Sequence, residues 1–248
     1  MSNALVIIPT YKERDNVVAV IDSVLAQPKD FHVLIIDDGS PDGTADLVKK
    51  LQSQYNTSKD TKIHLIERQG KLGLGTAYLT GFQYAIDHGY DYVLEMDADF
   101  SHDPKDLNPL YLMCSEFGND VAIGSRYATG VNVVNWPIGR VLLSYFASSY
   151  VRLITGMPIR DTTAGFVCYK RKVLETIPLD RVKFVGYAFQ IEMKFLVWKY
   201  GFKQAEVPII FTERVRGESK MSAGIFKEAF FGVLQMTIAS WFKKYIPA

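Results

Sequence analysis

Strand-like and helix-like segments alternate along the first half of the chain. Short runs dominated by apolar side chains predict buried strands at residues 5–8, 33–36, 63–67, 92–96 and 121–125. Apolar residues at helical spacing predict helices at residues 16–25, 44–54, 75–88 and 105–117, the second capped by Thr44 and the fourth preceded by Pro104. This alternation predicts an α/β fold, with a mostly parallel sheet flanked by helices on both faces.

The alternation ends after residue 128. Residues 136–158 form an apolar stretch that contains Arg140 and Arg152 but no Asp or Glu. The residues after this stretch predict a polar loop at 161–166, an amphipathic helix at 190–200 and a strand at 206–211.

The C-terminal segment has the pattern of a helix that lies on a membrane. Apolar residues recur in pairs every four positions over residues 225–246, and lysines fall outside this stripe. A terminal helix packed on the core would show the same stripe, so both interpretations stay open. The chain shows no linker and no repeat. We therefore expect one domain over residues 1–222, with 136–158 as an interfacial helix, and an amphipathic helix over 223–248.

Charge and cysteine content exclude several classes of protein. The formal net charge of +1 argues against a general nucleic-acid binder. Cys114 and Cys168 are too few for a disulfide framework, and the first residues lack the basic start of a secretory signal. The longest uncharged stretch, residues 229–242, is shorter than the ~20 residues that span a bilayer. We expect a protein that is soluble or lies on a membrane without crossing it.

Polar residues follow each of the five predicted strands. They are Thr10-Tyr11-Lys12-Glu13, Asp37-Asp38-Gly39-Ser40, Glu67-Arg68, Asp97-Ala98-Asp99 and Ser125-Arg126-Tyr127. Ligands of open α/β sheets bind beyond the carboxyl ends of the strands. The five segments therefore predict one shared site.

Asp97 and Asp99 are the sharpest chemical signal in the chain. Two carboxylates one residue apart at a strand end can hold Mg²⁺ or Mn²⁺, which take hard oxygen ligands together with substrate phosphates. Such an ion stabilises charge on a diphosphate leaving group. A simple turn before a helix would explain the same two residues.

Three further segments allow a functional and a structural interpretation. The loop from Asp37 to Gly43 is either a turn or a set of acceptors for a nucleobase or ribose. The Gly-rich basic loop from Arg68 to Gly75 is either flexible or a phosphate-binding helix start, although it matches neither the dinucleotide fingerprint nor a P-loop. The basic run from Arg214 to Lys220 is either a solvated loop or a lid that closes on phosphates.

These segments together resemble family 2 glycosyltransferases, and more narrowly the polyprenol-phosphate mannosyltransferases. The resemblance rests on the motifs Pro9-Thr10-Tyr11-Lys12-Glu13, Asp37 to Thr44, Gly70-Lys71-Leu72-Gly73-Leu74-Gly75 and Met96-Asp97-Ala98-Asp99-Phe100-Ser101-His102. It continues through Gly124-Ser125-Arg126-Tyr127 and Asp161 to Phe166 as far as Lys220.

The resemblance implies a GT-A fold, a divalent metal, GDP-mannose as donor, a polyprenyl (dolichyl) phosphate as acceptor and inversion at the anomeric carbon. It implies that Asp97 and Asp99 hold the metal, and that Asp99, Arg126 and Arg140 are the catalytic residues. The substrate-binding residues that it implies are Pro9, Tyr11, Glu13, Ile36, Asp37, Asp38, Lys71, Ala98, Ser101, Ser144, Arg214 and Lys220.

A lipid phosphate acceptor is already anionic near neutral pH, so we expect no essential general base. Cations must instead bring two anions together: a metal on the donor, and Arg126 with Arg140 on the acceptor. We expect the protein on the cytoplasmic face of a membrane, held there weakly or through an anchoring protein partner. UDP-glucose as donor, a glycan or protein as acceptor, and a non-catalytic nucleotide-sugar-binding partner stay open as alternatives.

Overall fold

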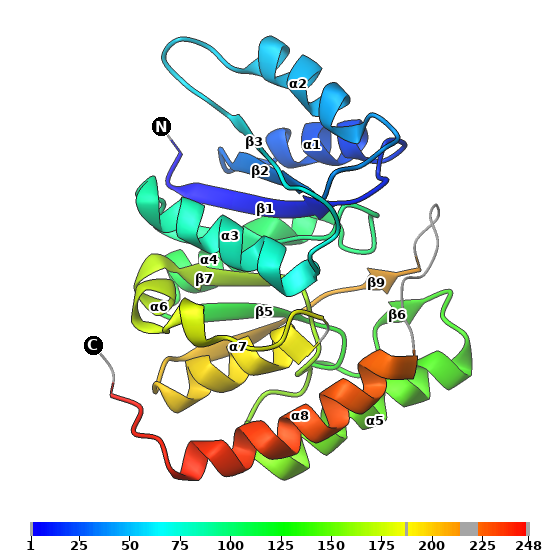
Figure 1. The fold of residues 1–248 in the computed structure, drawn as a ribbon, viewed down its shortest axis with the longest axis vertical. Coiled ribbons are helices and arrows are strands. Elements are labelled where there is room, and N and C mark those ends of the chain that lie inside the picture. The colour runs from blue at the N-terminus through cyan, green and yellow to red at the C-terminus, as the bar shows by residue number, and fades with distance from the viewer. Residues whose placement is uncertain (1, 187, 214–222, 247–248) are drawn as a thin grey trace.

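The computed structural model describes residues 2–186, 188–213 and 223–246. One sheet has the strand order β3-β2-β1-β4-β7-β5-β8 (Figure 1). Its strands are β1 (Ala4–Thr10), β2 (His32–Asp37), β3 (Ile63–Glu67), β4 (Tyr92–Glu95), β5 (Val121–Ser125), β7 (Val167–Lys170) and β8 (Gln204–Pro208). A second small sheet pairs β6 (Val133–Val134) with β9 (Phe211–Thr212).

Helices cover both faces of the main sheet. They are α1 (Val17–Leu25), α2 (Thr44–Tyr55), α3 (Leu74–Asp87), α4 (Leu107–Ser115), α5 (Ile138–Thr155), α6 (Arg171–Thr176), α7 (Ala188–Lys199) and α8 (Ala223–Trp241). Two short 3₁₀ turns, Pro104–Asp106 and Leu179–Arg181, complete the secondary structure of the described residues. The predicted α/β fold with a mostly parallel sheet is confirmed.

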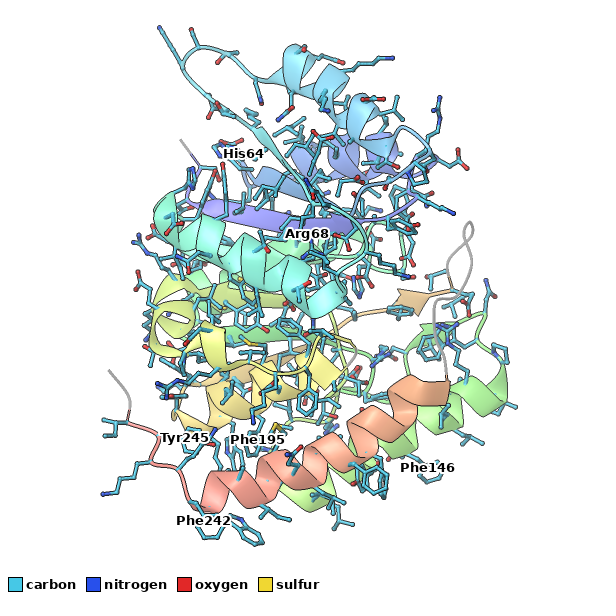
Figure 2. All side chains as sticks on the ribbon, viewed as in Figure 1. His64, Arg68, Phe146, Phe195, Phe242 and Tyr245 are labelled. Atoms are coloured by element: carbon cyan, nitrogen blue, oxygen red, sulfur yellow. The ribbon has the colours of Figure 1, made fainter. Side chains whose placement is uncertain are left out.

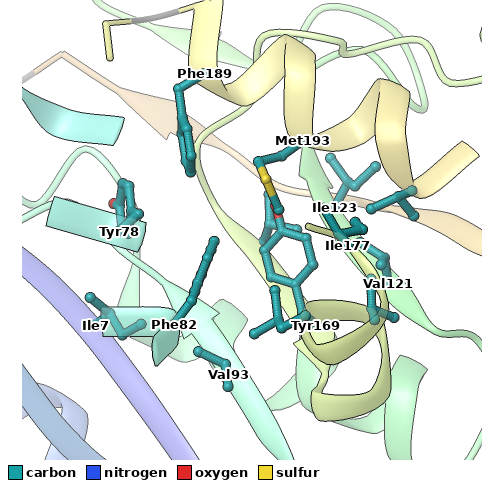
Figure 3. Close-up of a cluster of buried hydrophobic side chains, with 14 of the residues drawn as sticks. Ile7, Tyr78, Phe82, Val93, Val121, Ile123, Tyr169, Ile177, Phe189 and Met193 are labelled. Atoms are coloured by element: carbon teal, nitrogen blue, oxygen red, sulfur yellow. The ribbon is translucent and has the colours of Figure 1, made fainter. Parts of the chain in front are cut away.

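Successive residues of each strand serve opposite faces of the sheet. In β1, Leu5 and Ile7 join the core that contains α3, α6 and α7, whereas Val6 and Ile8 join the core under α1, α2 and α4. Figure 3 shows part of the first core, where Ile7, Tyr78, Phe82 and Phe189 pack together. Each such side chain contributes about 1.5–3 kcal/mol when it is fully buried, so both faces drive folding.

Gly81 allows α3 to lie close to the sheet. A Cβ atom at this position would lie 2.7 Å from the side chain of Ile7 in β1. The approach seats Tyr78 and Phe82 against the sheet, and both are fully buried. The start of α3 is thereby held at the carboxyl edge of β1.

β7 is the one main-sheet strand, among the described residues, that runs against the others. It pairs antiparallel with both β4 and β5, so that Cys168 lies opposite Leu94 on one side and Ala122 on the other. The sequence prediction missed this strand because it is only four residues long and follows a polar loop. Its direction brings the loop that precedes it to the carboxyl edge of β4 and β5.

Several predicted elements differ in detail from the structure. The helix predicted at 105–117 is a 3₁₀ turn followed by α4, and the strand predicted at 206–211 is divided between β8 and β9. Thr44 is the first residue of α2 rather than its cap, because Gly43 takes the cap position with a left-handed φ of 84°.

The helix predicted at 190–200 is not amphipathic, because α7 is covered on most sides. Its polar residues Gln190, Glu192 and Lys194 are buried together with its apolar ones. Glu192 accepts the backbone N–H groups of Lys183 and Phe184 at 2.9 and 3.0 Å. Hydrogen bonds, not solvent, therefore satisfy the polar groups that suggested an exposed face.

α5 and α8 lie side by side along one end of the molecule (Figure 1). The ring of Tyr150 in α5 stacks on Phe230 in α8 with centroids 4.7 Å apart, and its hydroxyl donates to the Phe230 carbonyl at 3.0 Å. Within the described residues, neither helix nor any other is long and apolar enough to cross a bilayer.

Candidate active site

The sheet brings the predicted polar segments to one edge. Thr10 at the end of β1 pairs with Asp37 at the end of β2, and Asp37 pairs with Glu67 at the end of β3. β4 runs parallel to β1. Because β7 is antiparallel to both β4 and β5, β5 runs in the same direction as β4 and also ends at this edge. The predicted placement of all five strand ends at one edge is therefore confirmed.

Asp37 holds the ends of β1 and β2 together. Its Oδ2 accepts the hydroxyl groups of Thr10 at 2.8 Å and Ser40 at 2.6 Å, and its Oδ1 accepts the Ser40 backbone N–H at 2.8 Å. The residue is 1% exposed. A buried carboxylate needs such partners, so Asp37 is occupied in shaping the loop after β2.

The loop after β1 is tied to the same loop. Ser40 Oγ accepts the Lys12 N–H at 2.9 Å, and Thr44 Oγ1 accepts the Glu13 N–H at 3.2 Å. Lys12 has a left-handed φ of 57°, which turns the chain sharply between Tyr11 and Glu13. The side chains predicted to bind a nucleoside thus come from a cross-linked pair of loops.

Cations flank the ring of Tyr11. The Nζ atoms of Lys12 and Lys71 lie 5.7 and 5.5 Å from the ring centroid, within the range of cation–π attraction. Pro9 is half-buried beside this turn. The predicted residues Pro9, Tyr11 and Lys71 therefore belong to one neighbourhood at the ends of β1 and β3.

Asp38 forms a largely buried ion pair with Arg68. Arg68 Nε donates to Asp38 Oδ1 at 2.7 Å, and the side chains of Arg68 and Asp38 are 8% and 10% exposed, respectively. The same guanidinium donates to Thr76 Oγ1 at 2.8 Å and to the Gly73 carbonyl at 3.3 Å. Arg68 therefore connects the end of β2 to the start of α3, a role that the sequence did not assign to it.

Two predicted substrate-binding residues have no side chain at the surface. Ile36 is 0% exposed and Ala98 is 4% exposed, and both belong to the hydrophobic cores. The Ile36 side chain is buried because helices cover both faces of β2, and Ala98 lies in the turn after β4 with its methyl group in the core. Only their backbone atoms are in a position to meet a ligand.

The acidic motif follows β4 in a tight turn. Asp99 Oδ1 accepts the Ser101 N–H at 3.0 Å, and the Asp97 N–H donates to His102 Nδ1 at 3.2 Å. Phe100 adopts a left-handed φ of 59°, which folds Ser101 and His102 back towards the two acids. Burial lowers the pKa of His102 to about 4, so its ring is neutral and serves as a hydrogen-bond acceptor.

A cavity of about 470 Å³ opens beside this turn. Asp97, Asp99, Ser101, Arg126 and Arg140 line its polar part. Its apolar part is lined by side chains of α5 and α8, which are Leu143, Phe146, Ala147, Tyr150, Val151 and Phe230. One cavity therefore joins a charged end to a hydrophobic end.

The donor set at the polar end fits a divalent cation. Two carboxylates on one tight turn face the cavity, and Ser101 adds a hydroxyl beside them. Hard oxygen ligands of this kind suit Mg²⁺ and Mn²⁺. The structure therefore offers residues for the predicted ion, and their role as ligands stays a prediction.

Arg126 is held in a fixed position by Asp161. Its Nε and Nη2 atoms donate to the two Asp161 oxygens at 2.8 and 2.6 Å, and Nη2 also donates to Thr163 Oγ1 at 2.8 Å. Burial alone would lower the pKa of Arg126, but the Asp161 carboxylate raises it overall. Burial likewise opposes the charge of Asp161, yet Arg126 lowers the pKa of this acid. The pair is therefore charged near neutral pH.

Arg140 is more exposed and pairs with Glu213. Its Nη1 atom donates to Glu213 Oε1 at 2.6 Å, and its guanidinium carbon lies 4.2 Å from the centroid of Trp136. About a quarter of each charged side chain is exposed, 28% for Arg140 and 27% for Glu213. Ser144 lies one turn further along α5 and lines the same cavity.

A buried polar chain lies under the cavity. Gln190, which lines the cavity, donates from Nε2 to Glu95 at 2.9 Å and accepts at Oε1 from Lys194 Nζ at 3.2 Å. Burial raises the pKa of Glu95 to about 8 and lowers the pKa of Lys194 to about 8. Lys194 also donates to the Ala164 carbonyl, so the chain supports the loop that carries Asp161 and Thr163.

The predicted site residues therefore fall into two groups. Those predicted for the metal and the acceptor line the cavity together, namely Asp97, Asp99, Ser101, Arg126, Arg140 and Ser144. A second set of predicted substrate-binding residues lies at the ends of β1 to β3 and not in this cavity: Pro9, Tyr11, Glu13, Asp37 and Asp38, with Lys71 from the loop predicted to bind phosphate. Arg214 and Lys220 lie outside the described residues.

Asp161 and Glu213 are the main residues that the sequence did not assign. Each pairs with a predicted catalytic arginine. Asp161 carries a signal in the sequence, because it is the first acid after a stretch of 40 residues, 121–160, without Asp or Glu. Glu213 has no comparable signal, and only the folded chain brings it to Arg140.

Curated relatives match almost the whole chain. A polyprenol monophosphomannose synthase of Mycolicibacterium smegmatis is 45% identical over 234 residues, which cover 94% of this chain and 86% of the relative. An undecaprenyl-phosphate mannosyltransferase of Micrococcus luteus is 39% identical over 236 residues, which cover 95% and 94%.

Solved structures share the fold at low identity. A mannosyltransferase from Pyrobaculum calidifontis in complex with GDP-Man and Mn²⁺ matches with a TM-score of 0.58 and 19% identity, over 97% of this chain and 64% of the other. Glucosyl-3-phosphoglycerate synthase of Mycobacterium tuberculosis with Mn²⁺ and UDP matches with a TM-score of 0.64 and 17% identity, over 99% and 81%.

These neighbours have the GT-A fold that the resemblance implied. The curated relatives belong to the group of mannosyltransferases that the resemblance named. The sequence profile described as glycosyl transferase family 2 matches residues 5–178, which is more than half of the chain. With the strand-end site and the acidic turn already in place, this match settles the classification: the chain belongs to glycosyltransferase family 2.

Proposed function

We propose that this protein transfers mannose from GDP-mannose to a polyprenyl phosphate, with inversion at the anomeric carbon. The two curated relatives are named for mannosyl transfer to polyprenyl carriers, and they match this chain over nearly its full length. The observation that carries the proposal is the cavity that joins Asp97, Asp99, Arg126 and Arg140 to an apolar wall. A phosphate with a long hydrocarbon tail matches both ends of such a cavity.

Asp97 and Asp99 would hold the divalent cation, Mg²⁺ or Mn²⁺, and Ser101 lies beside them. When bound, the ion would neutralise the diphosphate of the leaving nucleotide. The loops after β1 and β2, with Tyr11, Glu13 and Asp38, would hold the nucleoside.

Arg126 and Arg140 would hold the acceptor phosphate. Among the described residues, Nη1 of Arg126 and Nε and Nη2 of Arg140 have no hydrogen-bond partner, while the other nitrogens bind Asp161, Thr163 and Glu213. The acids therefore fix each guanidinium in place and leave donors for phosphate oxygens. This arrangement brings a second anion next to the donor diphosphate without a buried excess of positive charge.

The reaction needs no general base on the protein. A phosphate oxygen of the acceptor would form the new bond to C1 of mannose, and the bond from C1 to the diphosphate would break with its electron pair, which releases GDP. The acceptor oxygen carries no proton that must be removed at neutral pH. His102 Nδ1 already accepts a hydrogen bond from the Asp97 N–H. The Gln190 amide already donates to Glu95 and accepts from Lys194.

The outer sides of α5 and α8 would rest on the membrane that carries the acceptor. Large apolar side chains are exposed there, and Figure 2 shows Phe146 and Phe242 turned away from the sheet. The others are Ile138, Leu142, Leu143, Leu153, Phe231, Ile238 and Trp241. Neither α5 nor residues 230–246 contain Asp or Glu, whereas Arg152, Lys243 and Lys244 are exposed. An apolar surface with cations and without anions suits an anionic bilayer.

The test of the function offers radiolabelled GDP-mannose or UDP-glucose, each with a short polyprenyl phosphate and Mn²⁺. Label from GDP-mannose should enter the organic phase, and chelation of the metal should prevent it. If label entered the lipid only from UDP-glucose, the donor would be UDP-glucose and not GDP-mannose. No labelled lipid from either donor would contradict the proposal.

Matched variants test the arginine role. Arg140→Met keeps most of the side-chain volume but removes the guanidinium, so kcat/KM for the acceptor should fall about 10- to 100-fold. Calorimetric affinity for GDP-mannose should stay unchanged. Arg160→Met is the control, because Arg160 is exposed and binds the Ala128 carbonyl instead. Equal losses of donor affinity and acceptor turnover in Arg140→Met would refute the assignment.

A second pair of variants tests the membrane face. Leu153 in α5 is 83% exposed, and Phe117 beyond α4 is 69% exposed. Leu153→Asp should weaken cosedimentation with anionic vesicles severalfold, while Phe117→Asp should leave it unchanged. Equal vesicle binding by both variants and the unmodified protein would place the membrane contact elsewhere. The side of the membrane and an anchoring partner stay predictions.

A further inference from the structure

A second group of metal-ligand side chains lies at the opposite edge of the sheet. His32 begins β2, Asp30 precedes it by two residues, and Asp60 comes from the loop before β3. One ligand atom from each lies within 4.8 Å of the others. β2 is six residues long, so this edge is roughly 17 Å from the strand end at Asp37. Figure 2 shows the two edges by His64 and Arg68, near the two ends of β3.

His32 and Asp60 form a close ion-pair contact. His32 Nε2 lies 3.2 Å from Asp60 Oδ1, yet neither atom has a hydrogen-bond partner among the described residues, and both atoms are buried. His32 is 4% exposed. Two ligands bound tetrahedrally to Zn²⁺ at about 2.05 Å lie about 3.3 Å apart, so the observed separation suits a shared ion.

The other nitrogen of His32 belongs to an ordered chain of rings. His32 Nδ1 lies 2.8 Å from the Tyr90 hydroxyl, which lies 3.0 Å from His64 Nε2, and His64 Nδ1 lies 2.8 Å from the Tyr84 hydroxyl. If Nδ1–H donates to Tyr90, the hydroxyl donates onward to His64. A neutral His32 ring then presents its lone pair at Nε2, towards Asp60. Metal-bound histidines commonly fix their tautomer through such a partner on the second nitrogen.

A lysine side chain contacts one acid of this group. Lys62 Nζ lies 3.0 Å from Asp30 Oδ1, and 36% of its side chain is exposed. A cation bound between the acids would displace this ammonium into solvent. Both nitrogens of His64 are occupied by tyrosines, so His64 supports the site without being a ligand.

We infer that Asp30, His32 and Asp60 form a Zn²⁺ site, with a water molecule completing the coordination. One imidazole nitrogen and two carboxylate oxygens favour Zn²⁺ over Mg²⁺, which takes oxygen ligands. The ion would join the start of β2 to the loop before β3. This site is separate from Asp97 and Asp99 and does not depend on the proposed mannosyl transfer.

The test uses full-length protein carrying Asp97→Asn and Asp99→Asn, which removes the other predicted cation site. After treatment with a chelator, calorimetric titration with ZnCl₂ should give one ion per chain, and Co²⁺ should give visible absorption bands of a nitrogen–oxygen site. MgCl₂ should give no comparable binding. Absence of stoichiometric Zn²⁺ binding would overturn the inference.

Variants of the ligands locate the ion. In the same background, His32→Gln and Asp60→Asn should each weaken Zn²⁺ binding at least tenfold. The control, His88→Gln, changes an exposed histidine at the end of α3 and should leave binding unchanged. Asp60→Asn removes one ligand from a partly exposed loop, so it remains informative if His32→Gln does not fold. Zn²⁺ binding that is equal in Asp60→Asn and His88→Gln would also overturn the inference.

Discussion

The two sides of the strand-end site are built in different ways. Around β1 and β2, polar contacts join residues close in sequence, such as Thr10 with Asp37 at a separation of 27. Around the cavity, they join distant residues: Arg140 meets Glu213 across 73 residues, and Gln190 meets Glu95 across 95. The first side consists of adjacent loops, and the second is assembled from helices and loops of the whole C-terminal half.

The two sides also differ in how their charged side chains are stabilised. On the first side, hydroxyl and backbone N–H groups satisfy Asp37, and these are fixed once the strands pair. On the second side, each arginine needs an acid that the sheet topology must deliver. We expect the cavity side to be more sensitive to single substitutions than the β1–β2 side.

The largest effect is expected from Asp99→Asn. Loss of one carboxylate at the acidic turn should reduce mannosyl transfer roughly 10³-fold or more, because charge on the leaving group is no longer balanced. Initial rates against Mn²⁺ concentration give the measurement. Asp103→Asn, which keeps a capping side chain at the 3₁₀ turn, is the matched control. Full activity of Asp99→Asn in the presence of a chelator would contradict a role for the metal in the reaction.

Asp161→Asn should have the next largest effect, on stability. It leaves the Arg126 guanidinium buried without its counter-charge, which costs about 3–5 kcal/mol in comparable buried pairs. Urea denaturation measures the free energy of unfolding. Asp91→Asn breaks a pair with Arg171 in which the Asp91 side chain is 48% exposed, and it should cost below about 1 kcal/mol. Similar costs for both variants would contradict the contrast between buried and exposed pairs.

Thr10→Val should produce a smaller loss on the β1–β2 side. It removes one of several hydrogen bonds to Asp37, and a bond to a charged group contributes about 1.5–3 kcal/mol. Because Ser40 keeps two bonds to the carboxylate, we expect about 1.5 kcal/mol in urea denaturation. A cost above that of Asp161→Asn would reverse the comparison of the two sides.

The last effect is absent at neutral pH and appears only on acidification. Burial lowers the pKa of His64 from 6.5 to about 4, so between these values the unfolded chain binds more protons than the folded one. Stability from this group is complete above pH 6.5 and is lost as pH falls towards 4, by up to about 1.4 kcal/mol per pH unit. His64→Gln should flatten this slope in unfolding experiments, and His88→Gln should not. An unchanged slope in His64→Gln would assign the acid sensitivity to other groups.

Much of the fold could be predicted because alternating strands and helices depend on local patterns. β1 to β5 and α1 to α3 agree with the sequence prediction within a few residues. β7 was missed because an antiparallel strand inserted between β4 and β5 has no local signature. The buried α7 was misread because its polar residues are satisfied by partners far away in sequence.

The site follows the same division. Motifs at strand ends predicted that Asp97 and Asp99 lie at one edge with the polar ends of the other strands. Glu213 could not be predicted as the partner of Arg140, because only the β6–β9 pairing brings the two together. Asp161 carries a signal as the first acid after a long acid-free stretch, but its pairing with Arg126 depends on the sheet order. Ile36 stays a prediction for its backbone atoms, because its side chain is fully buried.

The reversed direction of β7 has a consequence for how this scaffold can vary. The chain leaves the sheet at Ser125 and returns at Val167 on the same edge, so the intervening segment with α5 forms an excursion whose two ends both lie beside the acidic turn. Its length and composition can change without shifting the register of any strand in the main sheet. Exchange of this segment between related chains is therefore a route to new acceptor preferences on an unaltered donor platform.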